Sequence, residues 1–167
     1  MSGYAAVDVG YPAAGGATAA VVLADSPTFA RLVRELTVHR AHVAAYRPGA
    51  FRERELPPLL DAVAALDAVP DLLVVDGYAT LDPAGRPGLG AHAHDALGVP
   101  VVGVAKTAFR GATHAVPVLR GGAQRPLLVT AVGLAVEEAA QLVRGMAGPH
   151  RLPDALRRVD ALSRGRR

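Results

Sequence analysis

The stretch YAAVDVGYPAAGGATAAVVL, residues 4–23, contains two apolar runs separated by a turn rich in Pro, Ala and Gly. This pattern predicts an antiparallel hairpin. Alternation along the first run places Asp8 on the face opposite to Val7 and Val9. A carboxylate in the middle of a strand is costly to bury unless a cation or a hydrogen-bond donor meets it. The stretch therefore predicts the first two strands of a sheet and a first candidate site residue, Asp8.

The segment after the hairpin is ambiguous, and a helix follows it. Residues 30–45 fit either a third strand or a short helix, and we favour a strand over residues 36–43. The spacing of Leu59 and Val63 predicts a helix from about Leu56, with two prolines in its first turn, where a missing N–H costs nothing.

The second half of the chain alternates between strand and helix patterns. We expect strands at residues 71–76, 99–105 and 126–130, helices at residues 89–97, 136–146 and 153–163, and a loop-rich segment at residues 107–125. Antiparallel strands followed by alternating strands and helices indicate an α/β fold, with a mixed sheet of antiparallel hairpin strands and parallel strands and with helices on both faces.

Length and composition favour one small globular domain. The chain has 167 residues, 51% of them hydrophobic, and no cysteine, which excludes disulfides and thiolate metal sites. No apolar run approaches the ~18 residues that span a bilayer, and no signal-peptide pattern opens the chain. We expect a single domain over residues 1–167, a monomer, in the cytoplasm and away from membranes.

Positive charge is concentrated in a basic C-terminal helix and tail, residues 151–167. This segment carries six Arg and two Asp, a net charge of +4, against +3 for the whole chain. It fits either a solvated end or a nucleic-acid-binding arm. Of the 18 basic residues, Lys106 is the one lysine, which points to a position where a compact ammonium is needed.

Two further acids stand where an apolar run meets a break. Glu55 precedes the predicted helix, Asp76 closes the strand at residues 71–76, and Lys106 follows another strand. Each acid alone fits a helix cap or a surface charge. Together with Asp8 they predict a Mg²⁺ or Mn²⁺ site, because hard cations prefer oxygen ligands. Such ions serve phosphodiester hydrolysis, and Lys106 could stabilise charge on the phosphate.

Five segments in order resemble the Endonuclease V family. They are VDVGY (residues 7–11), YRPGAFRERELPPLL (46–60), DLLVVDG (71–77), GLGAH with GVPVVGVAKT (88–92 and 98–107), and HRLPDALRR (150–158). The second segment is the most specific, since it resembles the family's Tyr-x-Pro-Gly…Phe-Arg-Glu-x-Pro block.

The resemblance implies a ribonuclease-H-like fold and Mg²⁺-dependent hydrolysis of DNA, with RNA as a second substrate, one phosphodiester beyond the 3′ side of inosine, in repair. The implied catalytic residues are Asp8, Glu55, Asp76 and Lys106, of which the three acids are metal ligands. The implied substrate-binding residues are Tyr46, Pro48 and Gly49 in a wedge that replaces the extruded base, with Gly49, Gly77 and Gly103 lining the base pocket.

The chain departs from the family pattern at three positions. Ala79 replaces a glycine, Asp82 replaces a histidine, and Leu134 follows Gly133 where the family has another histidine. Asp82 fits either a fourth metal ligand or a turn residue before Pro83. These changes leave open a relative with weakened cleavage or altered specificity that binds nucleic acid.

A third hypothesis is a phosphotransferase of the actin-like kind, suggested by VDVG at residues 7–10. It is disfavoured because the sequence contains no second phosphate loop and is too short for two lobes.

Overall fold

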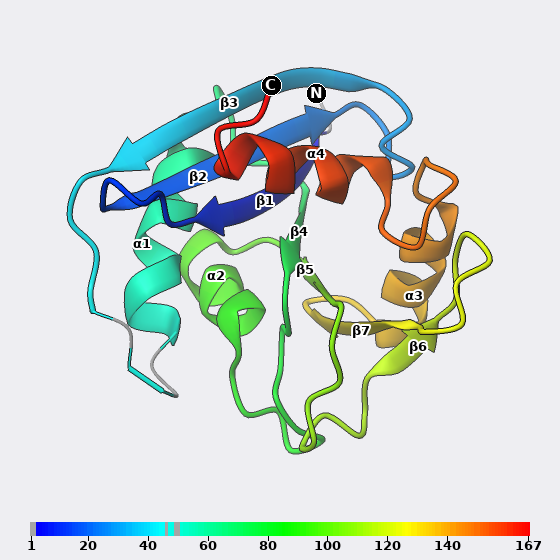
Figure 1. Cartoon of the computed structure of the whole chain (residues 1–167). Coiled ribbons are helices and arrows are strands. Elements are labelled where there is room, and N and C mark those ends of the chain that lie inside the picture. Colours follow the sequence, from blue (N-terminus) through cyan, green and yellow to red (C-terminus); the bar gives the residue numbers. More distant parts are fainter. Residues whose placement is uncertain (1–2, 46, 49–50) are drawn as a thin grey trace.

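The computed structural model describes residues 3–45, 47–48 and 51–167, except for the side chains of residues 51–53. Over these residues, seven strands form one sheet in the order β3-β2-β1-β4-β5-β7-β6 (Figure 1). The strands are β1 (Tyr4–Gly10), β2 (Ala17–Ala24), β3 (Leu32–Arg40), β4 (Leu72–Asp76), β5 (Val101–Ala105), β6 (Val116–Val118) and β7 (Leu127–Val132). The helices are α1 (Phe51–Ala64), α2 (Leu89–Leu97), α3 (Val136–Gly145) and α4 (Asp154–Ser163).

The pairing confirms the predicted mixed sheet. Strands β1, β2 and β3 pair antiparallel, as the hairpin pattern predicts. Strands β1, β4 and β5 run parallel to one another at the centre. Strand β7 pairs antiparallel with β5, and β6 pairs antiparallel with β7 at the far edge. The central parallel strands matter most for function, because parallel strands end at the same edge of a sheet and collect their terminal residues there.

Two apolar cores fill the space on the two sides of the sheet. Ala5 and Val7 of β1 point into the core under α1 and α2, whereas Ala6 points into the core that α3 and α4 cover. Figure 1 shows α4 lying across β1 and β2, on the opposite side from α1. The strict alternation along β1 fixes which face each side chain occupies. No helix in the described part of the chain has the length and hydropathy needed to cross a bilayer.

Two strands differ from the sequence-based expectation. Strand β3 begins at Leu32 rather than at residue 36 and is largely exposed, so its pattern lacks the apolar alternation of a buried strand. Strand β6 was not predicted, because three residues are too few to show a period. Its Pro117 is tolerated because β6 lies at the edge of the sheet.

The predicted start of α1 is wrong, and the error changes the setting of Glu55. The helix begins at Phe51, so Pro57 and Pro58 lie inside it and not in its first turn. Each proline withholds an N–H from the carbonyl four residues earlier. Glu55 therefore lies in the second turn of α1 and is not a residue at the helix start.

Candidate active site

Asp8 and Asp76 stand next to each other where the parallel pairing of β1 with β4 ends. The pairing of β1 with β4 ends at Val7 opposite Val75, and these acids are the next residue on each strand. Alternation places both carboxylates on the face of the sheet that α4 covers. The sheet register therefore brings together two acids that are far apart in sequence.

Lys106 follows β5, the third central parallel strand. Its Nζ lies 3.0 Å from Oδ2 of Asp76. Burial lowers the pKa of Lys106, but the pairing with Asp76 and the nearby charges of Asp160 and Asp8 outweigh this, so the net pKa is raised. The ammonium therefore stays charged and is fixed beside the acids.

Glu55 reaches the same place from α1. It is partly buried, and burial together with the charges of Asp8 and Asp76 raises its pKa to about 7, although Arg54 opposes the shift. Because α1 begins at Phe51, Glu55 lies in its second turn. The helix dipole stabilises carboxylates mainly in the first turn, so it contributes little to the ionised form of Glu55. Its electrostatic environment is set by the other acids.

Asp8 accepts hydrogen bonds from two donors, but its ionised form is still disfavoured by burial and by neighbouring carboxylates. Burial and the charge of Asp76 raise its pKa to about 6, with a smaller contribution from Asp160. The backbone N–H of Val9 and the hydroxyl of Ser163, which donates to Oδ2 of Asp8 at 3.2 Å, stabilise the ionised form. A carboxylate whose pKa is raised by neighbouring carboxylates is typical of a cation-binding site.

These side chains line a cavity of about 450 Å³ at the strand ends. Its walls include Asp8, Glu55, Asp76 and Lys106, and also Asp160 and Ser163 from α4. The structure thus brings together all four residues that the sequence predicts to be catalytic.

Asp160 and Ser163 were missed in the sequence. Ser163 shares the buried face of α4 with Leu156 and Val159, so a polar residue at helical spacing on an apolar face was the available signal. A close approach of α4 to β1 allows the contact, since a Cβ added to Gly10 would lie 2.4 Å from the carbonyl oxygen of Ser163. Asp160 had no sequence signal that separated it from the other charges of the basic tail.

The donor chemistry of this cavity fits a hard divalent cation. Carboxylate oxygens are the preferred ligands of such ions, and a cation would relieve the repulsion that raises the pKa values of Asp8 and Glu55. As placed, no three His, Asp or Glu side chains of the described residues are close enough to hold one ion. Binding would therefore have to draw the carboxylates together.

A second cavity, of about 600 Å³, adjoins the first and shares Glu55 and Asp76 with it. Gly77 follows Asp76 with φ +120°, and its N–H bonds to the carbonyl of Val104 at 2.9 Å. This positive φ favours glycine, so the turn carries backbone close to the cavity. The shared acids make the two cavities neighbouring compartments of one site.

An aromatic pair forms part of the wall of the second cavity. The rings of Tyr78 and Phe109 lie 5.9 Å apart between centroids. The Tyr78 hydroxyl donates to the carbonyl of Thr107 at 2.8 Å and accepts from the N–H of Phe109 at 2.9 Å. These bonds tie the turn after β4 to the loop after Lys106.

Gly103 supports this turn from behind and does not line either cavity. A Cβ at Gly103 would lie 2.5 Å from the nitrogen of Ala79 and 2.6 Å from the carbonyl oxygen of Gly77. Its predicted place in the wall of a base pocket is therefore replaced by a packing role. Ala79 is fully buried against Gly90, so its methyl group does not enter the second cavity.

The remaining predicted residues lie elsewhere. The backbone N–H of Arg86 donates to Oδ1 of Asp82 at 3.0 Å, so Asp82 is a turn residue and does not join the acids of the first cavity. Leu134 packs against the core under α3 and α4. Tyr46 and Gly49 lie outside the described residues, and Pro48 is exposed.

Comparisons with known sequences agree on one family. Residues 2–138 match the family described as Endonuclease V. A protein of this name from Azotobacter vinelandii is 36% identical over 181 residues, covering 95% of this chain and 80% of its own length. Another from Streptomyces coelicolor is 36% identical over 169 residues, covering 89% of this chain and 71% of its own length.

Solved structures agree with the sequence comparisons. The crystal structure of Endonuclease V from Streptomyces avermitilis has a TM-score of 0.79 at 30% identity and covers 98% of this chain and 80% of its own. Endonuclease V from Ciona intestinalis, solved in complex with a 24mer DNA containing an inosine followed by a ribo-adenosine, has a TM-score of 0.80 at 18% identity, covering 97% and 84%. The latter likeness supports the fold alone.

Proposed function

Because the chain belongs to the Endonuclease V family, we propose that its two adjoining cavities hydrolyse a DNA phosphodiester close to a deaminated purine such as inosine. Membership in the family makes the chain a nuclease, and the proposal concerns its site, metal and substrate. One observation carries it: Glu55 and Asp76 line both the carboxylate cavity and the second cavity. A base held in the second cavity therefore lies beside a phosphodiester in the carboxylate cavity.

In this proposal Asp8, Glu55 and Asp76 hold Mg²⁺ or Mn²⁺, and Asp160 adds a fourth carboxylate from α4. A bound divalent cation would supply a water nucleophile at neutral pH and neutralise charge on the phosphate. The protein itself contributes orientation. The hydroxyl of Ser163 donates to Oδ2 of Asp8 and so helps to orient that carboxylate.

Lys106 stabilises charge that develops on the phosphate. A fixed ammonium at the rim of a partly buried cavity is more effective than one in bulk water, because the dielectric is lower and no reorganisation is required. The ion pair with Asp76 keeps Lys106 in place in the free protein. Without substrate, the same ammonium partly neutralises the cluster of acids.

The second cavity receives the extruded base. Its volume of about 600 Å³ lies within the usual range of small-molecule sites. The rings of Tyr78 and Phe109 offer apolar surface against which a base can pack, and the backbone at Gly77 can approach the base edge closely. A wedge formed by residues 46–49 remains a prediction from the family resemblance.

The test is nicking of a labelled DNA duplex that carries a single inosine, with Mg²⁺ or Mn²⁺, against an otherwise identical duplex with adenine. We expect nicking of the inosine duplex by the wild-type chain, and loss of it in Asp76→Asn. Asp95→Asn is the matched control, because Asp95 is exposed on α2 and lines neither cavity. Absence of nicking with either metal, under conditions where the Streptomyces coelicolor relative cuts, would overturn the proposal.

A second candidate function is binding of deaminated DNA without cleavage. It is favoured by the finding that the acids of the described residues are not close enough, as placed, to enclose one ion. It predicts that Asp76→Asn leaves the affinity for the inosine duplex unchanged and that the wild-type chain never nicks it in metal.

We propose in addition that residues 1–167 act as one domain and a monomer, with the basic helix and tail at residues 151–167, in the cytoplasm. DNA is the first substrate and RNA a second. Sedimentation of the purified chain and nicking of inosine-containing RNA test the monomer and the RNA substrate.

A further inference from the structure

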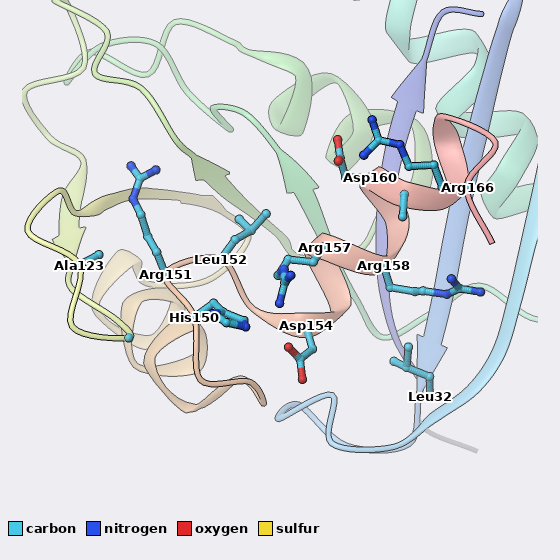
Figure 2. A pocket seen from close by; sticks show the side chains of 12 residues that line it. Leu32, Ala123, His150, Arg151, Leu152, Asp154, Arg157, Arg158, Asp160 and Arg166 are labelled. Carbon is cyan, nitrogen blue, oxygen red and sulfur yellow. The ribbon is translucent and has the colours of Figure 1, made fainter.

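A basic groove lies beside the carboxylate cavity, on the face of the sheet that α4 covers. It has a volume of about 1000 Å³ and is lined by four arginines, Arg151, Arg157, Arg158 and Arg166, against two acids, Asp154 and Asp160. Figure 2 shows that most of these side chains come from α4 and the segments on either side of it. A concave surface with excess positive charge is the electrostatic footprint of a polyanion.

Two of the four guanidinium groups are occupied within the fold. Arg151 donates to the carbonyls of Arg125, Lys106 and Pro126. Arg158 forms a two-point ion pair with Glu35, at 2.9 Å and 2.6 Å. Arg151 therefore holds the segment before α4 against the residues that follow β5 and precede β7, and Arg158 anchors α4 to β3.

The other two guanidinium groups are available. Arg157 and Arg166 line the groove, and within the described residues neither side chain has a hydrogen bond or an ion pair. Arg157 projects into the middle of the groove in Figure 2, near His150 and Asp154. Asp154 lies in the first turn of α4, where a carboxylate complements the helix dipole.

The end of α4 holds Arg166 in position. Gly165 has φ +75°, its N–H bonds to the carbonyl of Leu162, and the N–H of Arg166 bonds to the carbonyl of Ala161 at 2.8 Å. These are the two hydrogen bonds of a Schellman motif, which turns the chain back at a helix end. The basic tail is therefore an ordered wall of the groove up to Arg166.

The groove adjoins the carboxylate cavity, because Asp160 lines both. Arg164 bonds to Oδ1 of Asp160 at 3.0 Å and so lies at the junction. A strand whose phosphate occupies the cavity can therefore continue over α4 into the groove. Charge complementarity and this adjacency point to the same occupant.

We propose that this groove binds the sugar-phosphate backbone of the DNA strand as it leaves the cleavage site, with Arg157 and Arg166 contacting its phosphates. The inference rests on the proposed function, since it takes the carboxylate cavity as the place of the scissile phosphate. It assigns a DNA-binding role to the basic C-terminal segment, which takes no part in the chemical step.

The test is the salt dependence of DNA binding, measured by fluorescence anisotropy with the full chain, a labelled inosine duplex and EDTA, so that cleavage does not interfere. Each phosphate contact contributes about 0.9 to the slope of log K against log salt. Arg157→Ala is therefore expected to lower the slope by about one and to weaken binding roughly eightfold at about 0.1 M salt. Arg157→Lys keeps the charge and the slope.

Arg144→Ala is the matched control, because Arg144 is an exposed arginine in the last turn of α3 that does not line the groove. It changes net charge equally and is expected to leave the slope unchanged. Shortening the duplex on one side of the inosine should weaken the wild-type chain at least as much as Arg157→Ala does, and should weaken that variant less, because only Arg166 is left there to lose a contact. Equal slopes for the wild type, Arg157→Ala and Arg144→Ala would overturn the groove proposal.

Single-turnover nicking at saturating enzyme separates this inference from the proposed function. Arg157→Ala is expected to need a higher enzyme concentration to reach its maximal rate, since the groove contributes to binding, whereas Arg144→Ala should keep both the rate and the half-saturating concentration of the wild type. A wild-type chain that shows the predicted slopes but never nicks would contradict the proposed function and support the groove. A wild-type chain that does not bind the duplex would overturn both.

Discussion

Asp8 and Asp76 directly follow Val7 and Val75, the last residue pair in the parallel register of β1 and β4. Because both acids alternate onto the face that α4 covers, the end of the sheet itself creates a pair of neighbouring carboxylates. Burial and the charge of Asp76 raise the pKa of Asp8 to about 6. Lys106, on the next parallel strand, neutralises part of this charge by pairing with Asp76.

The raised pKa values predict a pH dependence of stability in the absence of metal. Asp8 and Glu55 have pKa values of about 6 and about 7, above their ordinary values of 3.8 and 4.5. The folded chain therefore holds these protons more tightly than the unfolded chain. Their contribution to stability is complete below about pH 4 and is lost as the pH rises through about 7.

Thermal unfolding in EDTA across this pH range measures the effect. Asp8→Asn is expected to flatten the fall in the midpoint temperature and to raise the midpoint at about pH 8. In the wild type, Mg²⁺ should stabilise more at about pH 8 than at about pH 5, because protons compete with the cation. Equal stabilisation at both pH values would contradict a metal site built from these carboxylates.

Replacement of Lys106 should affect the chemical step. Lys106→Ala removes the ammonium beside Asp76 and is expected to slow single-turnover nicking at saturating metal by about a hundredfold. Lys106→Arg keeps the charge but substitutes a planar, less compact group, so we expect an intermediate rate. An alanine variant that nicks within about twofold of the wild type would exclude this role.

Loss of the Ser163 hydroxyl should alter the pH dependence of metal use. Ser163→Ala removes a donor to Oδ2 of Asp8, which raises the pKa of Asp8 further because that bond stabilises the ionised form. Nicking at about pH 6.5 should then need several-fold more metal, an effect of about 1 kcal/mol, and the difference should shrink by about pH 8.5. Ser26→Ala, which removes a distant hydroxyl bonded to Thr28, should leave both values unchanged.

Two glycines with opposite surroundings test the packing behind the second cavity. A Cβ at Gly103 would lie within 3.0 Å of Ala79, Gly77 and Thr130. Gly103→Ala should therefore destabilise the fold by about 1–3 kcal/mol and displace the turn after Asp76. The measurement is the free energy of unfolding in urea, together with nicking.

Gly145→Ala provides the control for that measurement. Gly145 ends α3, and a Cβ there would meet no atom within 4 Å. Alanine should leave stability unchanged or raise it by up to about 1 kcal/mol, because it favours the helix more than glycine does. Equal destabilisation by the two substitutions would contradict the close packing of β5 against the turn.

The accuracy of the sequence-based fold depended on how buried each element is. Helix α2 lies at the residues predicted. Strands β4 and β5 differ from the prediction by one or two residues at one end, because their apolar runs are continuous and sharply bounded. Strands β3 and β6 were poorly predicted, since both lie at the edges of the sheet and carry little apolar patterning. The start of α1 was predicted too late, because its two prolines were assigned to the first turn. The preference of proline for that turn is only statistical.

The sequence by itself determined the strands that carry Asp8 and Asp76, the strand face on which Asp8 lies and the family to which the chain is similar, because local alternation and short motifs record these properties. The tertiary structure alone brought Asp160 and Ser163 to Asp8, removed Asp82 from the site and placed Gly103 behind the second cavity. It also built the basic groove from Arg157 and Arg166. These relationships join a C-terminal helix to an N-terminal strand, and only packing across the sheet creates such contacts.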